Sequence, residues 1–167
     1  MPSDPKTPLN QIPLPGLLDM ASEAMFEEFR EELVEAGYGD IRPTHGCVFR
    51  FVREDGMRLT ELATLAEMTK QSIGEIVDDL ASRGYVERFP DPADKRAKLI
   101  RLTAKGEQAQ SVGFGLFVKL EQRLAERYGA ERVAAMRELL EEVAATEAPE
   151  AVPELSGAAR AAMASAA

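Results

Sequence analysis

Apolar residues recur along this chain with the spacing of amphipathic helices. Residues 15–35 place a set of apolar side chains on one broad helical face, namely Leu17, Leu18, Ala21, Met25, Phe29 and Leu33. Residues 37–40 contain two glycines and break this pattern, and Pro43 begins a second helical stretch that runs to Val52. Two further stretches, residues 103–127 and 131–145, predict a pair of long C-terminal helices.

The segment 59–106 has a different organisation. It predicts two short helices, each beginning at a threonine that can cap it, Thr60 and Thr69. The second helix has apolar positions at i, i+3, i+4 and i+7, which are Ile73, Ile76, Val77 and Leu80. Gly84 follows at the place where a helix end favours a left-handed residue.

Two short strands and a charged loop follow these helices. Residues 85–89 and 99–102 are rich in aromatic and branched side chains and are read as paired strands. Pro90 and Pro92 are expected to stiffen the loop and keep it out of the ladder. The order helix, turn, helix, strand, loop, strand is typical of a winged helix-turn-helix, so we predict a mainly α (α+β) fold.

Several side chains in this segment suit double-stranded DNA. Lys70, Gln71 and Ser72 open the second helix, which contacts base edges in winged and related folds, and Gly74 would permit close approach. Arg96 on the stiff loop suits a narrow minor groove, with Asp94 orienting it. The candidates are Thr69, Lys70, Gln71, Ser72, Gly74, Glu75, Arg88, Asp94, Lys95, Arg96 and Lys98. A charged loop between two strands is more often only a solvated turn, and the complete order of elements favours DNA.

The segment resembles the DNA-binding lobe of the MarR family of bacterial transcriptional regulators. The matching stretches are TELA, TKQSIGEIVDDLASRGYVER, PDPADKRAKLIRLT and AKG. The resemblance implies an obligate homodimer that binds pseudo-palindromic promoter DNA, usually as a repressor released by a small aromatic effector or by thiol oxidation. This chain departs from the family at Glu75 and Asp79, where many members carry basic residues. Two acids near the recognition surface would repel phosphate.

The charge distribution is uneven. The formal net charge is −9, which alone argues against nucleic acid. Residues 57–105 nevertheless hold nine basic and eight acidic residues, a net charge of +1, so the rest of the chain holds −10. Residues 95–105 contain five cations and no acid. An acidic body with one basic edge is expected to suppress non-specific DNA binding and to orient the protein on a duplex.

The pattern divides the chain into five parts: a flexible arm (1–13), N-terminal helices for dimerisation and lobe support (14–56), the winged lobe (57–105), C-terminal dimerisation helices (106–145) and a flexible tail (146–167). The outer helices are more apolar than one small lobe requires. Paired between two subunits, they would form a helical dimerisation domain with two-fold symmetry. The alternative is that they close a bundle within one chain.

Catalytic and metal-binding chemistry lacks the necessary residues. The chain has one histidine, one cysteine and no Gly-rich phosphate loop, so we expect no enzyme, no cofactor and no metal. Cys47 is either a small buried residue or a redox-sensing thiol. Peroxide-sensing members of the family usually carry their cysteine in the first helix, so we expect Cys47 not to be the sensor.

An effector cleft is expected between the helical part and the winged lobe, lined by Met25, Phe29, His45 and Phe49, although each of these suits an ordinary core as well. No leader and no apolar run of about 18 residues is visible, so we expect a soluble, cytoplasmic protein with no membrane contact. The competing function is a winged-helix module for protein interaction, with Glu75 and Asp79 forming an acidic recognition face.

Overall fold

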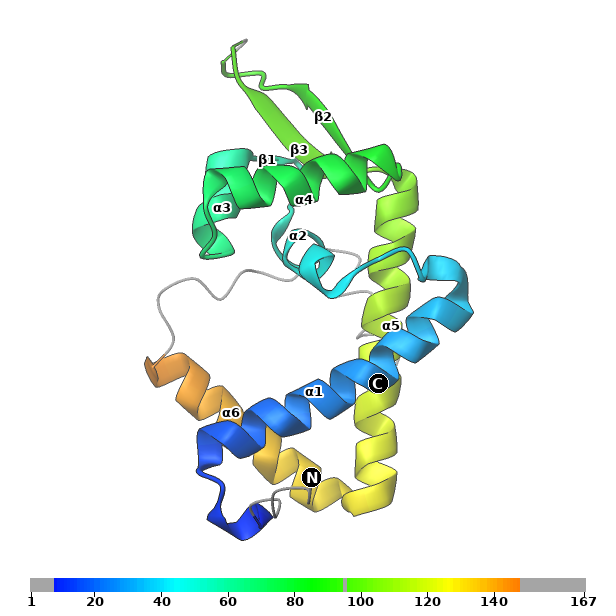
Figure 1. Cartoon of the computed structure of the whole chain (residues 1–167), viewed down its shortest axis with the longest axis vertical. Coiled ribbons are helices and arrows are strands. Elements are labelled where there is room, and N and C mark those ends of the chain that lie inside the picture. The colour runs from blue at the N-terminus through cyan, green and yellow to red at the C-terminus, as the bar shows by residue number, and fades with distance from the viewer. Residues whose placement is uncertain (1–7, 95, 148–167) are drawn as a thin grey trace, which may run out of the picture.

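The computed structural model describes residues 8–94 and 96–147, which form a winged lobe carried on long helices (Figure 1). The helical elements are η1 (Leu9–Gln11), α1 (Leu14–Leu33), η2 (Val34–Tyr38), η3 (Pro43–His45), α2 (Gly46–Phe51), α3 (Leu59–Leu65), α4 (Lys70–Ser82), α5 (Ala104–Tyr128) and α6 (Ala130–Glu147). Lys95, residues 1–7 of the expected arm and residues 148–167 of the expected tail lie outside the described residues. The predicted fold class is confirmed: the chain is mostly helical with a small antiparallel sheet.

The sheet has three strands, β1 (Met57–Arg58), β2 (Val86–Pro90) and β3 (Lys98–Leu102), in the order β1-β3-β2. The sequence predicted only the last two, because a strand of two residues has no periodicity of its own. Pro90 was expected outside the ladder, and this was wrong. It ends β2 opposite Lys98, at the strand end where a missing N–H is tolerated.

The core of the lobe lies where the two helices of the helix-turn-helix, the sheet and the start of α5 meet. The predicted apolar face of α4 is buried there, with Ile73, Val77 and Leu80 each 0% exposed. Around them pack Val48, Val52, Met57, Leu62, Tyr85, Val86, Ile100 and Leu102. This packing fixes which face of α4 remains free to meet a ligand.

Local signals set the ends of α4. The Thr69 hydroxyl accepts from the backbone N–H of Ser72 at 3.1 Å, as the sequence predicted. Gly84 follows the helix in the left-handed region with φ +77°. Thr60 is not a cap, because α3 already begins at Leu59. There the carboxylate of Glu61 accepts from the backbone N–H of Arg58 at 3.2 Å.

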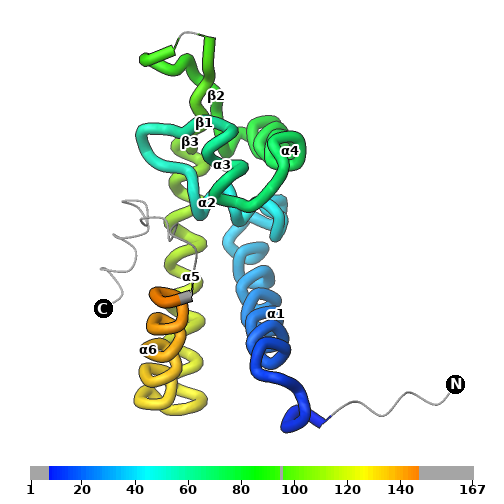
Figure 2. The backbone as a smooth tube through the Cα atoms, turned by 90° about the vertical axis from the view of Figure 1, so that its left-hand side faces the viewer, coloured from blue at the N-terminus to red at the C-terminus, as the bar shows by residue number. Residues whose placement is uncertain are grey.

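The start of α5 is held tightly against the end of α4. The Thr103 hydroxyl donates to the carbonyl of Gly84 at 2.6 Å, and the Lys105 ammonium donates to the carbonyl of Arg83 at 2.9 Å. From this junction α5 runs away from the lobe, and α1 packs against it (Figure 1 and Figure 2). Arg123 joins the two helices by ion pairs to Glu28 and Glu32. Within residues 8–94 and 96–147, no helix is long and apolar enough to span a membrane.

Candidate nucleic-acid interface

The first turn of α4 presents polar groups to solvent. Lys70, Gln71 and Glu75 are exposed, while the opposite face of the helix is buried in the lobe. The Gln71 side-chain amide donates to the Glu75 carboxylate at 3.3 Å. One cation, one amide and one carboxylate therefore lie together at the helix start, a set that suits base edges in a major groove.

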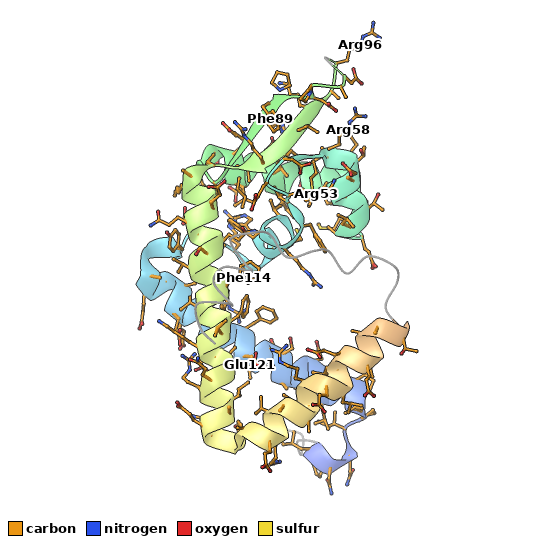
Figure 3. The ribbon with its side chains drawn as sticks, turned by 180° about the vertical axis from the view of Figure 1, so that it is seen from behind. Arg53, Arg58, Phe89, Arg96, Phe114 and Glu121 are labelled. Carbon is orange, nitrogen blue, oxygen red and sulfur yellow. The ribbon has the colours of Figure 1, made fainter. Side chains whose placement is uncertain are left out.

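The wing is the β2–β3 hairpin, and Arg96 lies at its tip, at one extreme of the molecule (Figure 3). Asp94 was expected to orient the Arg96 guanidinium. Instead its carboxylate accepts from the backbone N–H of Arg96 at 3.0 Å, which shapes the loop and leaves the guanidinium exposed. The placement of Lys95 lies outside the described residues.

An ion pair at the base of the wing was missed by the sequence analysis. Arg58 on β1 donates from Nε and Nη2 to the Asp91 carboxylate at 2.9 and 2.6 Å. Asp91 is 6% exposed and also accepts from the backbone N–H of Ala93 at 2.8 Å. The hydrogen bonds from Arg58 are the main reason why the pKa of Asp91 lies below its ordinary value. The contact anchors the wing to the lobe.

A basic hollow of about 380 Å³ lies between the starts of α3 and α4 and the sheet. Four cationic side chains line it, namely Arg58, Lys70, Arg88 and Lys98. The rest of the lining consists of Leu59, Thr60, Ala97 and Ile100. Arg88 pairs with Asp78 at 2.9 Å. Because cations from the recognition helix and from the wing meet here, the hollow suits a phosphate backbone. The half-buried Gly74 lies beside Leu59, and its role in close approach to a duplex stays a prediction.

Asp79 does not lie on the recognition surface, which corrects the sequence interpretation. Its carboxylate turns inward from α4 and meets the Nε2 of His45 at 2.9 Å. Arg83 donates to both of its oxygens at 3.1 Å. Of these two acids, only Glu75 is therefore exposed on the outer face of α4.

The four proposed effector residues lie in separate settings. The Phe29 ring stacks on Phe117 with centroids 4.1 Å apart, whereas Phe49 meets the edge of Tyr85 at 5.9 Å. His45 is 1% exposed and bonds to Asp79, and Met25 is half-buried on α1. An effector cleft lined by these residues stays a prediction.

Cys47 is half-buried at the start of α2. Its thiol donates to the carbonyl of Thr44 at 3.2 Å, and burial raises its pKa above the ordinary value. Both effects favour the unreactive thiol over the thiolate. Over the described part of the chain, no cluster of three or more His, Cys, Asp or Glu side chains is placed to hold a metal ion.

Comparisons with known proteins find relatives among transcriptional regulators. A family model described as the MarR family matches residues 47–98. The chain is 31% identical over 129 residues to the HTH-type transcriptional regulator PetP of Rhodobacter capsulatus, covering 71% of this chain and 75% of that protein. It is 30% identical over 95 residues to the transcriptional activator ExpG of Rhizobium meliloti, covering 57% of this chain and 49% of ExpG, about half its length.

The fold also matches a solved complex. A mutant of MarR from Escherichia coli complexed with operator DNA superposes with a TM-score of 0.62 at 28% identity. The match covers 82% of this chain and 99% of that one. The winged lobe and the long helices thus recur together in a protein whose bound ligand is DNA.

Proposed function

The chain belongs to the MarR family of transcriptional regulators, and we propose that it is a homodimeric repressor that binds a pseudo-palindromic operator. The observation that carries the proposal is the shared basic hollow. Lys70 from α4 and Arg58 and Lys98 from the sheet line this one hollow, and the exposed Arg96 lies at the tip of the wing (Figure 3). A helix start and a hairpin that share one cationic surface can engage a groove and the adjoining phosphates together.

In the proposed complex α4 enters the major groove. Gln71, Ser72 and Glu75 are placed to meet base edges, because they are solvent-accessible on the first turns of the helix. Arg96 reaches the minor groove, and the cations of the hollow contact phosphates. The likeness to the operator complex of Escherichia coli MarR supports this orientation.

The helical part supports the proposed dimer. Helix α6 has 18 residues, yet Val133 is its single buried apolar side chain among the described residues. Its remaining large apolar side chains are 41–57% exposed, namely Met136, Leu139, Leu140 and Val143. Helix α1 leaves Leu14, Leu18, Met20 and Phe26 exposed in the same way. A second copy covering these faces would give a two-fold dimer, and we propose that its recognition helices lie about 34 Å apart to match one turn of DNA.

Regulation by a small aromatic effector belongs to the proposal. Binding near Met25, Phe29, His45 and Phe49 would alter the spacing of the two recognition helices, and a coupling of about 1–3 kcal/mol is enough. We propose that this role is regulatory rather than catalytic, and that the protein acts in the cytoplasm, where its DNA would lie. The exposed carboxylate of Glu75 favours one alternative, a winged-helix module that binds another protein.

The test begins with selection of bound duplexes from a random DNA library at low salt. The recovered duplex is then titrated against salt with the wild type, with Arg96→Ala, and with Arg127→Ala as a matched control. Arg127 is an exposed arginine near the far end of α5, remote from the wing. We expect a pseudo-palindrome and a steep salt dependence. Arg96→Ala should lower the slope of log K against log salt by about 1, whereas Arg127→Ala should leave it unchanged.

Two results would contradict the proposal. Recovery of no duplex at low salt would make the protein-interaction module the better reading, with Glu75 at its centre. Equal effects of Arg96→Ala and Arg127→Ala would show that the wing contributes only general charge.

A further inference from the structure

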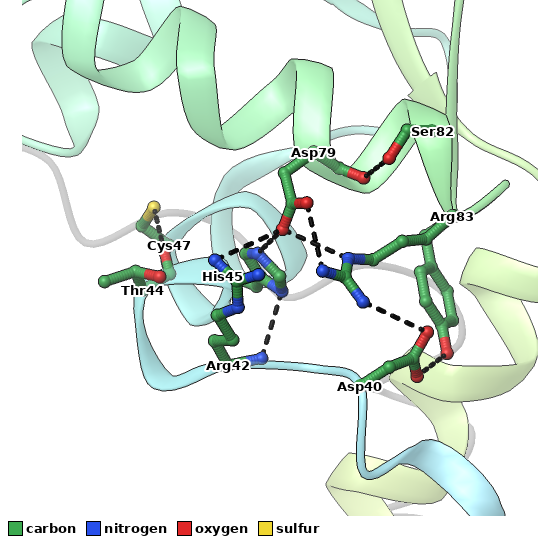
Figure 4. A network of polar contacts seen from close by, with 9 residues as sticks. Asp40, Arg42, Thr44, His45, Cys47, Asp79, Ser82 and Arg83 are labelled. Atoms are coloured by element: carbon green, nitrogen blue, oxygen red, sulfur yellow. Dashed lines mark hydrogen bonds and ion pairs between the residues drawn. The ribbon is translucent and has the colours of Figure 1, made fainter.

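A cluster of charged side chains lies between the C-terminal half of α4 and the connection that precedes α2 (Figure 4). We call it the clasp, and it consists of Asp40, Arg42, His45, Asp79 and Arg83. Asp79 and Arg83 belong to the C-terminal half of α4 and its cap, and the others to the connection between η2 and α2. The clasp therefore ties the recognition helix to the segment that leads from the dimerisation helix α1.

His45 is the buried centre of the clasp. Its Nδ1 accepts from the backbone N–H of Arg42 at 3.0 Å, so the one proton of the neutral imidazole must lie on Nε2. From there it is donated to the Asp79 carboxylate at 2.9 Å. Both ring nitrogens are satisfied only in this neutral tautomer.

The charges that face His45 are balanced without it. Asp79 takes two hydrogen bonds from Arg83, and the Arg42 guanidinium lies 3.8 Å from Asp79. Arg83 also approaches Asp40 at 3.8 Å, and Asp40 accepts from the Tyr85 hydroxyl at 2.7 Å. Two arginines therefore match two aspartates, and a proton on His45 adds an unmatched charge.

Protonation would also turn an acceptor into a donor. A proton on Nδ1 would point at the backbone N–H of Arg42, and two donors cannot share that contact. Either the ring or the connection at residues 40–45 must move. Burial is the main reason why the pKa of His45 lies below 6.5, and it outweighs the opposing influence of Asp79.

We propose that His45 is a positioning residue for DNA recognition: neutral, it holds α4 through Asp79, and its protonation opens the clasp and weakens operator binding. The inference rests on the proposed function. Because α4 is a single rigid helix, a displacement at Asp79 is transmitted to the first turn of the helix, where Lys70 lies nine residues away. Asp79 thus has a partner inside the protein on the helix that is proposed to contact DNA.

The direction of the pH dependence follows from the proton balance. The protonated form is favoured when the clasp is open, so operator affinity is full above pH 6.5 and falls as the pH drops below it. At pH 5.5 the loss is at most about tenfold, because an imidazole freed of the clasp would titrate near 6.5. His45 is the chain's single histidine, so no other side chain is expected to titrate in this range.

The experiment measures the affinity of the selected duplex between pH 5.5 and 8.0 at constant ionic strength. We expect the wild type to lose affinity several-fold below pH 6.5. His45→Gln, whose amide can still donate to Asp79 but does not titrate, should bind with a flat profile. Arg127→Ala, an exposed change near the end of α5 and outside the clasp, is the control and should retain the wild-type profile.

Nuclear magnetic resonance of the one histidine gives a second measurement that needs no variant. The imidazole Cε1–H signal of the wild type should titrate at a lower pH with the duplex bound than without it. Equal titration midpoints, or a pH profile unchanged in His45→Gln, would overturn the inference while leaving the proposed function intact. Failure to bind any duplex at pH 7.5 would instead overturn the proposed function, and this inference with it.

Discussion

At the scale of single residues, Cys47 shows how burial decides chemistry. Its thiol is half-buried, donates to the Thr44 carbonyl and has a raised pKa. We therefore expect hydrogen peroxide to change the operator affinity of the wild type by less than about twofold, since the thiolate is the reactive form. Binding assays with and without peroxide test this. If peroxide prevented DNA binding by the wild type but not by Cys47→Ser, Cys47 would be identified as a redox sensor.

The residues that the sequence placed correctly are those whose role is local. Thr69 caps α4 through a residue three positions away, and Gly84 adopts its positive φ because the helix ends beside it. The residues that it missed act over long separations. Arg58 meets Asp91 from 33 positions away, and Asp79 meets His45 from 34. An acid on a helix looks solvated in sequence until the fold supplies its partner.

At the scale of elements, two glycines of α5 differ in the space around them, and the sequence does not show this difference. A Cβ on Gly106 would lie 2.1 Å from the Tyr85 carbonyl oxygen, whereas one on Gly115 would meet nothing within 4 Å. Gly106→Ala should therefore destabilise the protein by about 1–3 kcal/mol or more through overpacking. Gly115→Ala in the same helix should stabilise it by about 0.5–1 kcal/mol through helix propensity.

Urea unfolding at one fixed protein concentration measures both changes, because a dimer's apparent stability depends on concentration. Each alanine variant serves as the control for the other. Equal midpoints for the two variants would show that Gly106 does not approach the Tyr85 carbonyl as closely as described. Periodicity predicted the extent of α5, but only the fold distinguishes a glycine that permits contact from one that does not.

The strands show the same limit. Residues in β2 and β3 carry enough aromatic and branched side chains to be recognised, and their pairing from Val86↔Leu102 to Pro90↔Lys98 is that of a hairpin. Strand β1 is two residues long and exists only through its pairs with β3, Met57↔Ile100 and Arg58↔Leu99. Such a strand is a consequence of the fold rather than of its own composition.

At the scale of the whole molecule, the exposed apolar side chains of the described long helices support the proposed dimer. Helices α1 and α6 together carry the eight large apolar side chains named above, and each of these is 41–66% exposed. Monomeric proteins rarely leave contiguous apolar surface of this kind uncovered. The acidic body gives a second reason to expect a dimer. A single lobe with a net charge near zero is expected to bind DNA weakly, whereas two lobes that are joined rigidly gain avidity.

Leu139→Glu tests both reasons to expect a dimer. Leu139 is 57% exposed on α6, so the substitution should leave the fold of each chain intact while placing a charge in the proposed interface. Sedimentation equilibrium should show a monomer where the wild type is a dimer, and operator affinity should fall by about 100-fold or more as bivalency is lost. Glu142→Gln, an exposed change on the same helix, should remain dimeric and bind normally. If the Leu139→Glu protein remained dimeric, the two-fold interface would lie on another face. If it were monomeric and still bound the operator with full affinity, operator binding would not depend on the dimer.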